Sequence, residues 1–72
     1  MTVRVNNGDR VMITAWLSKN IARHSYWLHD GRVGCTEWQL VRDMNTKSHS
    51  FVIFQDDTQE MIFRLATDFS DD

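Results

Sequence analysis

The stretch Ser50–Ala66, SFVIFQDDTQEMIFRLA, holds two dense apolar runs on either side of the polar insert 56–59. If the insert is a loop, the two runs form a β-hairpin in which Ile53 lies opposite Ile62. Such a hairpin is apolar on both faces. One face is expected to pack in the core, and the other must be covered from water. The outer patch, which also includes Phe51, must therefore meet a helix, a curled sheet or another molecule.

The length of 72 residues predicts one small domain, residues 1–72, whose core alone supplies little net stability. Cys35 is the only cysteine, so a disulfide within the monomer is excluded and a reducing, cytoplasmic setting is expected. No four-ligand metal pattern replaces the disulfide, which leaves self-association, as a homodimer, as the expected source of extra stability. No apolar run is long enough to cross a membrane, so no membrane contact is expected.

Charge is unevenly distributed along the chain, although the net charge is only −2. Residues 1–48 carry seven lysines or arginines and four acids, whereas residues 49–72 carry one arginine and six acids. Such asymmetry can mark a basic binding face with an acidic tail. In one compact domain the two halves interleave, so ordinary surface charge is the preferred interpretation.

The first twenty residues support two interpretations. Asn6-Asn7-Gly8 lies between the alternating stretches 2–5 and 9–13, which is typical of a hairpin with a three-residue loop and predicts a strand through Leu17. A long helix from Asp9 to Leu28 is the alternative, because apolar or aromatic residues recur at helical spacing. These are Ile13, Leu17, Ile21, His24 and Leu28.

The remaining segments complete the expected fold. Residues 25–29 predict an aromatic strand that closes at Asp30-Gly31, and residues 36–44 suit a short helix or a strand. Residues 67–72 predict a flexible acidic tail. The expected fold class is mainly β, a small and strongly bent barrel or sheet with a short helix. The alternative is α+β, with an N-terminal helix packed on a C-terminal β-hairpin.

Aromatic and basic residues alternate between positions 10 and 42, a mixture typical of single-strand nucleic-acid binding. The candidate nucleic-acid-binding residues are Arg10, Trp16, Lys19, Arg23, Trp27 and Arg32. A small domain also needs its large side chains in the core, so at least two of the three tryptophans are expected to be buried. Trp27 is the tryptophan expected at the surface, because its neighbours in a strand point the other way.

No catalytic or cofactor motif emerges from the sequence. His24, His29 and Cys35 lack the spacing of common zinc sites, so no metal is expected. Asp56-Asp57 is typical of a turn rather than of a general acid and base. We therefore expect neither an enzyme nor a cofactor.

Two short stretches resemble strands of small barrels of the Tudor and KOW type. They are Gly8-Asp9-Arg10-Val11-Met12-Ile13 and Val52-Ile53-Phe54-Gln55-Asp56-Asp57. The resemblance covers only these two short stretches and implies a five-stranded, strongly bent barrel that binds nucleic acid or a peptide along one face. The segment 18–29 is longer than in those barrels, and a clear aromatic cage is missing.

Together these features favour a non-enzymatic protein-interaction module, or a small regulatory or inhibitor protein. The expected protein interface consists of Phe51, Ile53, Ile62 and Arg64. A compact nucleic-acid-binding domain that uses the basic aromatic residues is the alternative, although an isoelectric point near 5.8 is low for that class. The start at Met1 without a targeting segment suits a regulator encoded by a virus or a mobile element.

Overall fold

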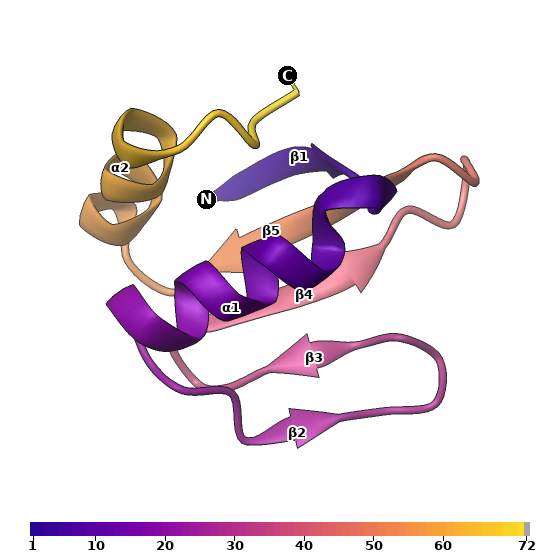
Figure 1. Ribbon diagram of the computed structural model, residues 1–72, viewed down its shortest axis with the longest axis horizontal. Helices are drawn as coiled ribbons and strands as arrows, with labels where there is room; N and C mark the ends of the chain where they lie inside the picture. Colours follow the sequence, from indigo (N-terminus) through magenta and orange to yellow (C-terminus); the bar gives the residue numbers. More distant parts are fainter. Residues whose placement is uncertain (72) are drawn as a thin grey trace.

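Five antiparallel strands form one open sheet, and α1 lies across one of its faces in the computed structural model, which describes residues 1–71 (Figure 1). The strand order is β1-β5-β4-β3-β2. The elements are β1 (Thr2–Asn6), the 3₁₀ turn η1 (Asn7–Asp9), α1 (Arg10–Asn20), β2 (Tyr26–Trp27), β3 (Val33–Gly34), β4 (Trp38–Arg42), β5 (His49–Phe54) and α2 (Asp57–Ala66). The fold is therefore α+β with an unclosed sheet, and the expected closed barrel is not formed.

The core lies between the sheet and α1. In the sheet register Val3 pairs with Val52, Val52 with Leu40, and Leu40 with Val33. These four side chains form one row on the face under α1, and each is at most 1 % exposed. Because side chains alternate along each strand, their neighbours point to the opposite face of the sheet.

The N-terminal hairpin predicted across Asn6-Asn7-Gly8 is wrong, since the chain enters a helix there. The Asn6 side chain accepts a hydrogen bond from the Gly8 amide at 2.8 Å and so turns β1 into η1 and α1. The helix buries Ile13, Thr14 and Leu17, so the expectation of a strand through Leu17 is also wrong. Burial of this apolar face outweighs the low helix propensity of the β-branched residues.

The C-terminal hairpin is wrong as well, because only its first half is a strand. Asp56 caps α2 by accepting a hydrogen bond from the Thr58 amide at 2.8 Å, and Gln59 occupies the third helical position. The spacing of Asp56 and Gln59 is that of a capping box, but the buried Gln59 Oε1 has no hydrogen-bond partner within residues 1–71, so only the Asp56 half of the box is formed. α2 buries Phe63, whose ring meets the rings of Trp16, Phe54 and Phe69.

The expectations for residues 25–29 and 36–44 agree with the structure. Residues 36–44 contain the strand β4, which settles the choice between helix and strand, and β2 lies inside the predicted aromatic strand 25–29.

The segment 67–72, which was expected to be a flexible tail, makes contacts where it is described. Ser70 bridges Val5 at the outer edge of β1, and the Asp71 amide donates to the Arg4 carbonyl at 2.8 Å. Residue 72 of that segment lies outside the described residues.

Candidate functional site

Two surfaces of the molecule have the character of a binding site, and they lie on opposite faces of the sheet. The first is the face turned away from α1, which we call the open face and define by Tyr26, Val41, Phe51 and Ile53. Phe51 pairs with Val41, and Ile53 lies one pleat further along β5. Ile53 is 39 % exposed, whereas Val52 and Phe54 on the covered face are at most 2 % exposed. The sheet therefore presents an apolar centre to its surroundings.

Charges of both signs border the open face. At the β1 edge an Arg4 guanidinium nitrogen lies 3.2 Å from His49 Nδ1, and His49 Nε2 lies 2.5 Å from an Asp71 carboxylate oxygen. At the other border Arg32 forms an ion pair with Asp30 at 2.9 Å. The backbone amide of Arg32 also donates to Asp30, and this hydrogen bond lowers the pKa of the Asp30 carboxyl. Neither border has a single dominant sign of charge.

The four residues of the predicted protein interface fall into two groups. Phe51 and Ile53 lie on the open face, but Ile62 and Arg64 lie on α2. Ile62 is 46 % exposed. Arg64 donates to Glu60, one turn earlier in α2, at 3.0 Å and to Ser70 at 2.9 Å. The contacts of Arg64 therefore link α2 to the C-terminal segment.

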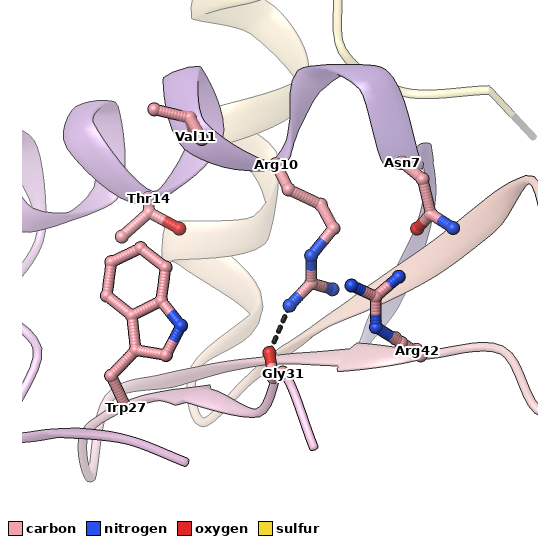
Figure 2. A pocket seen from close by; sticks show the side chains of 7 residues that line it. All are labelled: Asn7, Arg10, Val11, Thr14, Trp27, Gly31 and Arg42. Carbon is pink, nitrogen blue, oxygen red and sulfur yellow. Dashed lines mark hydrogen bonds between the residues drawn. The ribbon is translucent and has the colours of Figure 1, made fainter. Parts of the chain in front are cut away.

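The second surface is a pocket of about 280 Å³ between the start of α1 and the sheet (Figure 2). We call it the arginine pocket. It is lined by Asn7, Arg10, Val11, Thr14, Trp27, Gly31 and Arg42. In the sheet register Arg42 pairs with Ser50 on the covered face, beyond the end of the apolar row. Arg10 reaches this place from the first turn of α1 and donates to Ser50 Oγ at 2.7 Å.

Arg10 is held firmly in the arginine pocket. It donates to the Gly31 carbonyl as well as to Ser50, and the buried Ser50 hydroxyl in turn donates to the Asn7 side chain. Figure 2 shows the Arg10 and Arg42 guanidinium groups side by side. Burial lowers the pKa of Arg10, and the positive charge of Arg42 lowers it further. The two cations thus repel each other across a partly desolvated space.

Gly31 makes room for this pair of arginines. Its φ is +92°, in the region that glycine favours, and a Cβ atom there would lie 2.8 Å from Arg42 Nε. The same atom would lie 3.4 Å from Arg10 Nη2. A side chain at this position would therefore push against both guanidinium groups.

The six candidate nucleic-acid-binding residues do not all gather in one place. Arg10 and Trp27 line the arginine pocket. Trp16 packs its ring against Phe63. The others lie at the end of α1, in the loop that follows it, or in the ion pair with Asp30, and they are exposed. This last group is Lys19, Arg23 and Arg32.

The tryptophans divide as the sequence predicted. Trp38 is fully buried and donates its indole N–H to the Ala22 carbonyl at 2.7 Å, and Trp16 packs partly buried against the core. Trp27 is 59 % exposed. In Figure 2 its ring stands below Thr14 at one side of the pocket. The exposed tryptophan is thus also the one that lies near the two arginines.

Sequence reasoning missed Asn7, Gly31 and Arg42 as parts of a site. Gly31 was predicted only as a turn residue, and Arg42 lies inside the segment 36–44, for which the sequence left helix and strand open. The useful signal is the turn at Asp30-Gly31 before β3, and the pairing of Val33 with Leu40 then places position 31 beside Arg42. The proximity of Gly31 and Arg42 depends on the strand register, which the sequence alone did not define.

The possible metal ligands His24 and Cys35 have other surroundings in the structure, which describes residues 1–71. No group of three His, Cys, Asp or Glu side chains in this range could hold a metal ion. Cys35 is buried, and His24 shares a hydrogen bond with the Ser18 hydroxyl at 3.0 Å. No helix in the same range is long and apolar enough to cross a membrane.

No protein-family model matches the sequence, and neither a curated protein nor a solved structure is significantly similar to it.

Proposed function

We propose that this chain is a non-enzymatic protein-interaction module whose docking surface is the open face. The observation that carries the proposal is the uncovered apolar centre of the sheet, formed by Phe51, Val41 and the 39 % exposed Ile53. Such a centre with a polar border is the usual anatomy of a protein interface. A module of this size acts as a regulator or inhibitor by covering a surface of its partner.

We propose a second copy of the chain as the occupant in the isolated protein. The apolar residues lie on the central strands β4 and β5, so a twofold axis through the sheet would place apolar against apolar. Each border carries both an arginine and an aspartate, namely Arg4 with Asp71 and Arg32 with Asp30. The borders of the open face therefore do not repel those of a second copy through a single sign of charge.

The size of the open face limits the strength of this dimer. Three strands of five or six residues and two strands of two residues, spaced about 4.8 Å apart, cover roughly 330 Å². A stable interface needs about 800 Å² from each partner. We therefore expect a weak dimer with a dissociation constant in the micromolar range or above.

Sedimentation equilibrium at several protein concentrations tests this proposal. Replacing Ile53 with Lys buries a charge at the centre of the interface, so we expect at least about a tenfold weaker dimer. The monomer should remain folded by circular dichroism, because Ile53 lies outside the core. Leu65→Lys is the matched control, since Leu65 is 81 % exposed on α2. If Leu65→Lys dissolves the dimer and Ile53→Lys does not, α2 is the interface and the proposal fails.

Nucleic-acid binding is the second candidate function, and one observation favours it. Arg10 and Trp27 share the arginine pocket, which combines cations with an exposed aromatic ring. The net charge of −2 limits such binding to low salt. A single-stranded oligonucleotide titrated against rising salt tests it. Charge reversal at Lys19 and Arg23 should weaken the complex if the strand follows α1, and should leave it unchanged if only the pocket binds.

A further inference from the structure

The arginine pocket contains an uncompensated pair of positive charges. Within residues 1–71 neither Arg10 nor Arg42 forms an ion pair, and the side chain of Arg42 makes no hydrogen bond. The lining residues include no carboxylate and no histidine. Two adjacent cations without a counter-charge are unfavourable, and an anion between them would remove the repulsion.

The chemistry of the pair favours a phosphate over a carboxylate. A guanidinium presents several N–H groups in a flat fork that matches two phosphate oxygens at once. Arg10 keeps its orientation through Ser50 and the Gly31 carbonyl, so little entropy is lost when it binds. Arg42 is exposed and its guanidinium makes no hydrogen bond within residues 1–71, which leaves its N–H groups available to the remaining oxygens. The Arg42 fork, together with the Arg10 N–H groups not used by Ser50 and Gly31, can thus hold the three terminal oxygens of a phosphate monoester.

Trp27 adds an aromatic surface beside the phosphate position. Its ring is 59 % exposed and lines the same pocket as Val11 and Thr14 (Figure 2). Stacking of a base on such a ring contributes about 1–3 kcal/mol in single-strand binding proteins. The volume of about 280 Å³ is near the lower limit for small-molecule sites. It therefore suits one nucleotide rather than a larger cofactor.

We propose that the arginine pocket binds a nucleoside monophosphate unit, with its phosphate between Arg10 and Arg42 and its base against Trp27. The unit is either a free nucleotide or the phosphorylated end of a single strand. This assignment is independent of the open face and of its docking function.

Calorimetric titration of the full chain with adenosine 5′-monophosphate at low salt is the first test, with inorganic phosphate and adenosine as partial ligands. The monophosphate should bind at least about tenfold more tightly than either part, because both contacts are then made. Its affinity should rise as the pH passes the second phosphate pKa, near 6, while both arginines stay charged. No binding at millimolar monophosphate would overturn the proposal.

Variants separate the pocket from general charge effects. Arg42→Gln should weaken binding of the monophosphate about tenfold or more, since a charge-assisted pair of hydrogen bonds is lost. Arg32→Gln removes the same charge from an arginine that is paired with Asp30, and it should have little effect. Equal losses in both variants would overturn the site. Arg42 is exposed, so its replacement leaves the fold intact, and thermal melting checks this.

Two further experiments test whether the base contacts Trp27 and whether the phosphate belongs to a free nucleotide or to a strand end. Trp27→Leu should reduce affinity for the monophosphate but not for inorganic phosphate, and an unchanged preference for the monophosphate would overturn the assignment to a nucleotide. A short single strand with a 5′-phosphate is compared with the same strand without it. Tighter binding of the phosphorylated strand than of the monophosphate supports a strand end as the natural ligand, and equal affinity supports the free nucleotide.

Discussion

At the scale of single residues, Gly31 determines the geometry of the arginine pocket. Its carbonyl orients Arg10, its positive φ shapes the turn before β3, and its missing side chain leaves space for Arg42. A turn at Asp30-Gly31 was predictable from the sequence, because this pair is a strong turn signal. The place of Arg42 beside it was not, since two residues eleven positions apart become neighbours only through the pairing of β3 with β4.

Replacing Gly31 with Ala should impair both stability and ligand binding. We expect a loss of about 1–2 kcal/mol, because an L-residue is strained at positive φ, and a weaker complex with the monophosphate, because the new Cβ displaces Arg42. Urea unfolding and calorimetry measure the two effects. Gly8→Ala is the control, since Gly8 does not have a positive φ and a Cβ there meets only the Asn6 side chain. If Gly31→Ala were as harmless as Gly8→Ala, Gly31 would have no special role.

At the scale of secondary structure elements, a capping residue distinguishes a helix from a strand where hydrophobicity alone does not. The run 61–65 is apolar enough for a strand, but Asp56 before it caps a helix. The run 9–21 posed the same problem. There the spacing of Ile13 and Leu17 correctly indicated a helix face, whereas the Asn-Gly signal favoured a hairpin that does not form. Short apolar runs alone therefore did not separate the two structures.

The cap of α2 can be tested directly. Asp56→Ala removes the hydrogen bond to the Thr58 amide, so we expect the free energy of unfolding to fall by about 1 kcal/mol. Asp57→Ala in the same turn removes only a favourable charge near the helix start and should cost less. Urea denaturation of both variants makes the comparison. Equal losses would mean that charge, rather than the capping hydrogen bond, stabilises the end of α2.

At the scale of the whole molecule, the alternative α+β fold class was closer than the preferred β-barrel. An N-terminal helix does pack on the sheet, but the strand expected to complete a C-terminal hairpin is the helix α2. The interleaving of charge was predicted correctly, because β5, from the acidic part of the chain, lies between β1 and β4. The sequence also indicated that the outer patch with Phe51 and Ile53 needs a cover, and it left open whether a helix, a curled sheet or another molecule supplies it. It did not indicate the sheet order, which depends on pairings between distant segments.

The docking role of the open face is tested most directly by amide NMR spectra. The spectra are recorded on labelled protein at concentrations from millimolar down to micromolar. We expect concentration-dependent shifts that cluster at Val41, Phe51 and Ile53 on β4 and β5, because a second copy leaves this surface on dilution. Amides of α2 serve as the internal control and should stay constant. Shifts confined to α2, or spectra that do not change with concentration, would contradict the account.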